Sequence, residues 1–351
     1  MSKLEVMSKE IDYRQWQGST ADELGYGKGN LYTSYTYRHQ ATNGQETNVF
    51  VVDGRRSDND PTIVGSTVYN YRIDEMLKVR HKIISHQANA RVITTEWRGV
   101  SIDSEDPWDT QGDCMTIPQL VNNSLGRFDS MALSQLEAID AAVDLRAGEL
   151  IRLQAESLGT VAIAAMLRVL SEDRFTKALS VSSVDIIESV NTYGDRKFLR
   201  PLTVLKKLEN IEAPRHEYYF KENQLIGHAD VTAFERMSPE NMAIWKFLTH
   251  KQRLAVVSPA IGLHRSLLPT LLAGLGDNKI FRDVPIAFYR GSDSTVSLES
   301  DVVAAAEAIL NIGANARVFN LTAGRGDTTK IGHHFGTSLG RQASFAQLLR
   351  D

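Results

Sequence analysis

The spacing of hydrophobic residues along the chain predicts alternating strands and helices. Short apolar runs at 62–64, 90–95 and 150–154 are typical of buried strands, and apolar residues at helical spacing follow over 131–145 and 161–170. Strands that alternate with helices favour a mainly parallel sheet that is covered on both faces. The pattern therefore predicts an α/β protein.

Two runs of β-branched and aromatic residues near the N-terminus predict a hairpin. The runs 31–37 and 47–52 flank the dipeptide Asn43-Gly44. An Asn-Gly pair between two such runs favours a tight turn, because both central residues of that turn need a positive φ. We expect these two strands to be antiparallel neighbours at the start of the sheet.

The remaining segments define the expected domains. Residues 1–28 are polar, show no sustained period and are interpreted as an N-terminal arm. Residues 187–278 contain helical pieces with little strand character, and strand patterning returns after them. No Gly/Ser/Pro-rich hinge flanks this stretch, which argues against a separate linked domain. We therefore predict a helical cap, or lid, at 187–278, inserted into a core formed by 29–186 and 279–351.

Composition and charge exclude several classes of protein. The chain of 351 residues is 42% hydrophobic and 23% charged, which is typical of a globular protein. The net charge of −4 is too balanced for binding nucleic acid or an anionic membrane surface. The single cysteine, Cys114, cannot form an internal disulfide, and no run of 18 apolar residues occurs. These features predict a cytoplasmic protein without membrane insertion. No zinc-ligand spacing and no phosphate-loop or dinucleotide fingerprint occurs, so no metal or cofactor is expected.

The most informative stretch of the sequence is 154–160, where a serine follows a predicted strand and precedes a predicted helix. Ser157 lies between two small residues, Ala155 and Gly159. Small residues are needed there because neighbouring elements approach closely where a strand turns sharply into a helix. The serine Oγ then points out above the sheet, and the N–H of Leu158 can face a developing oxyanion. The pattern predicts a nucleophile elbow.

Three blocks of the chain together resemble the α/β-hydrolase superfamily. Residues 60–67 are similar to the third strand and oxyanion loop of that family, with Gly65-Ser66 where many members have His-Gly. Residues 91–101 are similar to the next strand and its R-G-x-G-x-S turn, without the second glycine, and 153–159 are similar to the elbow. The resemblance implies the α/β-hydrolase fold, with a mostly parallel central sheet, an N-terminal antiparallel hairpin and an inserted helical cap.

The resemblance also implies a catalytic triad in the chain order Ser, acid, His. With Ser157 as nucleophile, the acid is expected just after the strand that follows the cap, where Asp293 lies in a turn similar to the family's G-x-x-D turn. Asp185, near the end of the preceding strand, is the alternative acid. The base is expected in the loop after the final strand, and a Gly-His-apolar pattern favours His333 over His334. The seven other histidines match no triad position.

In this interpretation the protein is a serine esterase that acts through an acyl-enzyme. Its oxyanion hole would be formed by the N–H of Leu158 and that of Ser66 or Thr67. The expected substrate is a carboxylic ester, thioester or lactone of a small to medium acyl group. Two alternatives stay open: an acyltransferase of the same fold, and a degenerate hydrolase fold that serves as a binding or structural protein. The sequence also leaves a homo-oligomer open.

Overall fold

The computed structural model describes most of the chain outside the middle of the expected cap and several loops. The described residues are 4, 6–27, 34–40, 46–57, 59–67, 75–97, 115–190, 192–193, 250–263, 267–276, 279–294, 296–326, 331 and 339–350. None of the helices in these ranges is long and apolar enough to cross a membrane.

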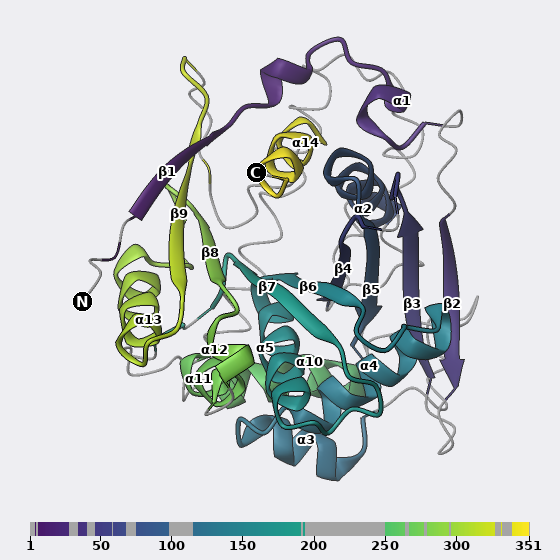
Figure 1. The fold of residues 1–351 in the computed structure, drawn as a ribbon, viewed down its shortest axis with the longest axis vertical. Coiled ribbons are helices and arrows are strands. Elements are labelled where there is room, and N and C mark those ends of the chain that lie inside the picture. Colours follow the sequence, from purple (N-terminus) through teal and green to yellow (C-terminus); the bar gives the residue numbers. More distant parts are fainter. Residues whose placement is uncertain are drawn as a thin grey trace.

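The described strands form one sheet of nine strands (Figure 1). They are β1 (Val6–Ile11), β2 (Ser34–Gln40), β3 (Glu46–Asp53), β4 (Thr62–Thr67), β5 (Arg91–Glu96), β6 (Leu150–Glu156), β7 (Ser180–Ile187), β8 (Ile286–Gly291) and β9 (Ala316–Ala323). Their order across the sheet is β1-β9-β8-β7-β6-β4-β5-β3-β2. Only β3 runs antiparallel to its neighbours β2 and β5, and all other pairs are parallel. The predicted α/β class and the antiparallel pairing of the first two predicted strands are confirmed, while the Asn-Gly turn itself lies outside the described residues.

Helices cover both faces of the sheet, as alternating strands and helices require. The described helices are α1 (Ala21–Leu24), α2 (Glu75–Ala88), α3 (Ile117–Ser124), α4 (Asp129–Val143), α5 (Thr160–Ser171), α10 (His250–Gly262), α11 (Leu268–Leu275), α12 (Lys279–Arg282), α13 (Glu299–Asn311) and α14 (Leu339–Leu348). Figure 1 shows α2 and α14 on one side of the sheet and α4, α5, α10 and α11 on the other. The sheet is thus the middle layer of three.

The alternation of side chains along the central strands distributes their buried residues between two core clusters, one on each face of the sheet. Leu153, Val184 and Phe288 are buried in the cluster that includes α5, whereas Ile63 and Tyr289 belong to the cluster that includes Phe345 of α14. Successive residues of a strand point to opposite faces, so a strand covered on both sides needs apolar residues in both sets. This explains why the central strands appear in the sequence as continuous apolar runs.

The N-terminal segment differs from the expected arm, because residues 6–11 form a strand. β1 pairs in parallel with β9 at the edge of the sheet. Its residues alternate between exposed and partly buried until Ile11, which is fully buried, and Leu24 of α1 is also fully buried. An edge strand of this kind exposes half of its residues to water, so its sequence carries too weak an apolar pattern to be recognised.

The last part of the expected cap packs onto the core. α11 contacts α5, and Leu267, Leu268 and Leu271 are buried in the same cluster as α5. α10 packs against α3. Residues 194–249 lie outside the described ranges, so the cap itself stays a prediction, while 268–275 contribute to the core beside the helix that follows Ser157.

Candidate active site

Ser157 occupies the sharp turn between a strand and a helix. β6 ends at Glu156, a single 3-10 turn covers Ser157–Gly159, and α5 begins at Thr160. The φ angle of Ser157 is 55°, in the left-handed region. A residue with a Cβ pays about 1–2 kcal/mol for that conformation. Local strain of this kind concentrates at functional sites, where the surrounding structure holds it in place.

Close packing around the turn explains the small residues that flank the serine. A Cβ built at Gly159 would lie far inside van der Waals distance of the Ser66 carbonyl oxygen, at the end of β4. The same Cβ would come within 3.3 Å of the Cβ of Ala155. Gly159 is therefore required by the contact between the turn and β4, whereas the methyl group of Ala155 fits, buried, on the other side of the serine.

The predicted oxyanion residues lie against this turn. Leu158 is buried in the 3-10 turn, at the N-terminal end of α5. Ser66 and Thr67 end β4 and are buried as well. The indole of Trp97 donates a hydrogen bond to the Ser66 Oγ at 2.9 Å, and the Trp97 N–H donates to the Thr67 carbonyl at 3.0 Å. Trp97, which the sequence does not single out, thus fixes the strand end that borders the serine.

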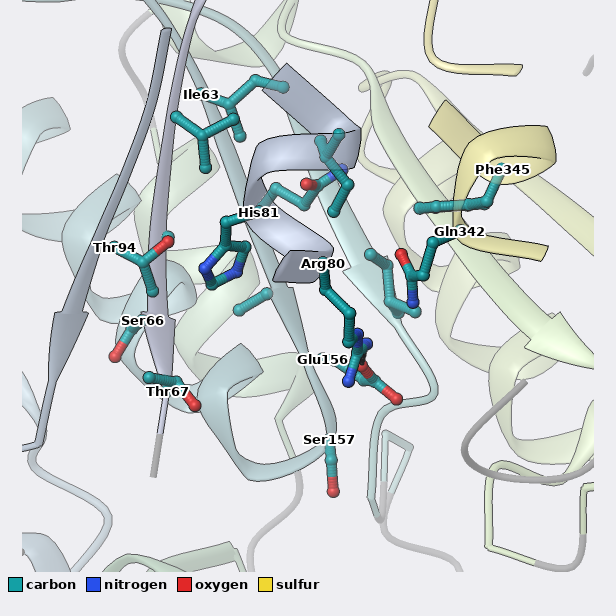
Figure 2. A pocket seen from close by; sticks show the side chains of 16 residues that line it. Ile63, Ser66, Thr67, Arg80, His81, Thr94, Glu156, Ser157, Gln342 and Phe345 are labelled. Atoms are coloured by element: carbon teal, nitrogen blue, oxygen red, sulfur yellow. Dashed lines mark hydrogen bonds and ion pairs between the residues drawn. The ribbon is translucent and has the colours of Figure 1, made fainter. Parts of the chain in front are cut away.

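An ion pair holds the residue that precedes the serine. Glu156 accepts a hydrogen bond from the Arg80 guanidinium of α2 at 2.6 Å, and both side chains are largely buried. A small pocket of about 70 Å³ lies next to this pair, lined by residues of β4, β5, β6, β7, α2 and α14 and by Ser157. Figure 2 shows Arg80 and Glu156 together, with the Ser157 hydroxyl pointing away from the other labelled side chains. The serine side chain is therefore directed outward from the sheet.

His81 lines the same pocket and is held in its neutral form. Burial lowers the pKa of His81 to about 3; the charge of Arg80 adds to this shift, and that of Glu156 opposes it. Among the residues that the structure describes, no three His, Cys, Asp or Glu side chains are grouped closely enough to bind a metal ion.

Asp293 lies in the turn directly after β8 and faces solvent. Its N–H donates to the Ile331 carbonyl at 2.9 Å, and the Ile331 N–H donates back to Asp293 Oδ2 at 3.0 Å. The Ser292 hydroxyl donates to the same oxygen at 3.1 Å. Within the described part of the chain, Oδ1 of Asp293 accepts no hydrogen bond. The contacts of the described residues thus orient the carboxylate through Oδ2.

Asp185, the alternative acid, lies inside β7 and is fully buried. Its carboxylate accepts two hydrogen bonds from the Arg152 guanidinium, one from Nε and one of 3.0 Å from Nη2. Arg152 also donates to the Leu349 carbonyl at 2.6 Å, beyond the end of α14. Burial raises the pKa of Asp185 and the charge of Arg152 opposes that shift. This geometry is that of an ion pair that ties the C-terminal segment to the sheet.

Strand register brings the candidate residues together at the carboxyl ends of the parallel strands. Glu156, Ile187, Tyr289 and Phe319 are partners in a row across β6, β7, β8 and β9. Ser157 follows the first of these strands, and the turn that holds Asp293 follows the third. One strand separates them, which corresponds to about 10 Å between the strand axes. His333 and His334 lie outside the described residues, so their positions are untested.

Glu188, directly after β7, also lies at these strand ends, and the sequence analysis does not identify it as a site residue. It is fully buried, and its carboxylate accepts hydrogen bonds from Gly291 and Ser294 on either side of Asp293. The only signal in the sequence is its place directly after a strand of the sheet.

No protein-family model matches the chain, and no curated protein matches it in sequence. Solved structures do match. A bromoperoxidase from Bacillus anthracis has a TM-score of 0.50 and 15% identity over 91% of this chain and 97% of its own. An esterase from Exiguobacterium antarcticum has the same TM-score and identity over 90% of this chain and 98% of its own.

The sheet order and the helices on both faces define an α/β protein, and the strained serine turn lies at the carboxyl ends of its parallel strands. The likeness to these solved structures shows that the chain has the α/β-hydrolase fold. The resemblance inferred from the sequence is confirmed at the level of the fold.

Proposed function

We propose that the protein is a serine hydrolase that cleaves a carboxylic ester, thioester or lactone of a small to medium acyl group, acting in the cytoplasm. The observation that carries the proposal is the left-handed Ser157 between β6 and α5, with Gly159 packed against β4. One of the proteins with a similar fold is described as an esterase, which agrees with acyl chemistry. Fold likeness alone does not decide function, so the proposal rests on the site.

The hydrogen bonds of Asp293 support its role as the acid. Ile331, which exchanges two hydrogen bonds with Asp293, lies two residues before His333. The contact therefore supports pairing Asp293 with a histidine two residues further along the chain. The same reasoning allows His334, one residue further on. We retain His333 as the proposed base and His334 as the alternative.

The proposed mechanism moves one proton and one acyl group. His333 accepts the proton of the Ser157 hydroxyl as Oγ attacks the carbonyl carbon, and Asp293 stabilises the imidazolium that forms. The N–H of Leu158, with that of Ser66 or Thr67, would bind the oxyanion of the tetrahedral intermediate. Losing one such donor typically lowers the rate about 10²–10³-fold. The imidazolium then protonates the leaving group, and a water molecule releases the acyl group from Ser157 by the reverse sequence.

Hydrolysis of p-nitrophenyl esters of graded chain length tests this function. We expect turnover by the wild type with an optimum at short to medium acyl chains, and loss of turnover in Ser157→Ala. Ser171→Ala is the matched control, because this serine lies at the other end of α5 and donates to the Arg168 carbonyl at 2.9 Å. Turnover that persists in Ser157→Ala, or no turnover by the wild type on any ester, would count against the proposal.

Added alcohol or amine acceptors separate hydrolysis from acyl transfer. A hydrolase releases the free acid at the same rate with or without the acceptor, whereas a transferase forms the acylated acceptor faster than the acid. We expect the free acid as the main product. If the acylated acceptor is the main product, the protein is an acyltransferase and not a hydrolase.

A further inference from the structure

Glu188 directly follows β7 and has an unusual backbone conformation, at the carboxyl ends of the strands where Ser157 and Asp293 lie. Its φ is 49°, in the same left-handed region as Ser157, and its side chain is fully buried. Its N–H donates to the Tyr289 carbonyl at 2.8 Å. Ile187 pairs with Glu156 of β6, so Glu188 and Ser157 are the residues that directly follow these two adjacent strands. The residue thus lies between the strand of the nucleophile and the strand of the acid.

The Glu188 carboxylate spans the turn that carries Asp293. Oε1 accepts a hydrogen bond from the Gly291 N–H, where β8 ends, and Oε2 accepts one of 2.6 Å from the Ser294 hydroxyl. Ser294 Oγ in turn accepts the Ser297 N–H at 3.1 Å. Because Gly291 and Ser294 are the first and last residues of this turn, one carboxylate fixes both of its ends.

The chemistry of these contacts favours a rigid turn. Hydrogen bonds to an ionised carboxylate are shorter and stronger than those between neutral groups. A buried carboxylate without these donors is destabilised by its uncompensated desolvation. Moving the turn away from Glu188 therefore raises the free energy of the folded protein. The neighbouring Asp293 is exposed and has no such burial to hold it. Its position depends on the turn and on the two hydrogen bonds with Ile331.

We propose that Glu188 is a positioning residue for Asp293: it clamps residues 291–294 so that the Asp293 carboxylate stays against Ile331 and faces the catalytic histidine. The proposal rests on the proposed function, since it assigns Asp293 as the acid. In this role Glu188 acts through the turn, by its hydrogen bonds with Gly291 and Ser294.

Kinetics of Glu188 variants on p-nitrophenyl acetate test this role. We expect Glu188→Ala to lower kcat about 10–100-fold with KM within threefold, because binding does not involve the acid. Glu188→Gln should recover part of kcat, since its amide oxygen can still accept the Gly291 N–H. A correctly placed Asp293 raises the pKa of the histidine, so Glu188→Ala should move the acidic limb of the kcat/KM profile to lower pH. A loss of kcat with an unmoved profile overturns the proposal.

A double-mutant cycle separates positioning from general damage. If Glu188 acts through Asp293, Glu188→Ala in an Asp293→Ala background should lower kcat by less than twofold further. A further 10-fold loss in that background contradicts the proposal. Glu299→Gln is the control: this exposed glutamate contacts β8 through Arg290 at 3.1 Å without touching the turn, and we expect kcat within twofold of wild type.

Amide hydrogen exchange tests the clamp independently of activity. In Glu188→Ala we expect exchange to rise at least 10-fold in peptides that contain Asp293 and Ile331, and to stay unchanged around Ser157. Unchanged exchange at Asp293, or a rise spread over the whole sheet, overturns the clamp. If the wild type has no esterase activity while exchange follows the first pattern, the proposed function fails and the structural role of Glu188 stands.

Discussion

Asp293 and Ile331 exchange two hydrogen bonds, one from each backbone N–H, that join the turn after β8 to the segment that follows β9. Ile331 is fully buried and lies just before the two candidate histidines. The proposed Ser-His-Asp triad requires its acid to be held in a fixed position. This contact involves the described residue nearest in sequence to His333 and His334, which are proposed from the sequence alone.

Substitution of the two candidate acids should separate their roles. Asp293→Asn should lower kcat by about 10³–10⁴-fold with little change in stability, because an exposed acid that orients histidine is lost. Asp185→Asn should destabilise the fold by about 3–5 kcal/mol, because it breaks a buried pair with Arg152. Steady-state kinetics and urea unfolding measure both effects. A catalytic loss confined to Asp185→Asn would make Asp185 the acid instead.

The two neighbouring histidines should respond differently. We expect His333→Ala to abolish ester hydrolysis and His334→Ala to keep at least a tenth of the wild-type kcat. The reason is that a single imidazole must accept the serine proton. Circular dichroism checks that both variants are folded. The reverse order of activities would assign the base to His334. If both variants keep the same activity, neither histidine is the catalytic base.

The turn around the serine should not accept a larger residue at Gly159. Gly159→Ala should destabilise the protein by about 1–3 kcal/mol and slow hydrolysis, because the added methyl group collides with the Ser66 carbonyl oxygen. Ala155→Gly is the control, since it removes a methyl group at the opposite flank and should cost no more than about 1 kcal/mol. Urea unfolding compares the two. A Gly159→Ala protein as stable and active as the control would contradict the packing described.

The neutral state of His81 predicts a loss of stability in mild acid. Its pKa is about 3 in the folded protein and about 6.5 when unfolded, so below pH 6.5 the unfolded chain binds the proton that the folded one does not. Stability should fall by about 2 kcal/mol between pH 6.5 and 5 from this residue. His81→Gln should show a shallower fall over that range in urea unfolding. Parallel curves for the variant and the wild type would show that His81 does not titrate in this way.

Local patterns predicted those features that depend on neighbouring residues in sequence. The turn at Ser157 could be predicted because its strand, its small flanks and its helix are contiguous. The sequence does not indicate α14, because Arg341, Gln342 and Ser344 are polar and yet buried, so the apolar pattern of this helix is weak. Tertiary packing, not local pattern, decides such elements.

Polar contacts between residues far apart in the sequence cannot be predicted from local patterns. Glu188 is separated from its partners Gly291 and Ser294 by more than a hundred residues, and Glu156 from Arg80 by 76. A single glutamate after a strand carries no pattern of its own. Its role follows only once the sheet register brings the strand ends together.

Covalent labelling with a fluorophosphonate tests the central claim most directly, because the reagent reacts with an activated serine and needs no knowledge of the substrate. Intact-mass measurement should show one adduct per chain, and peptide mapping should place it on Ser157. Ser157→Ala should take up no label, whereas Ser171→Ala should label as the wild type does. An unlabelled wild type, or a Ser157→Ala protein that labels fully, would contradict the account.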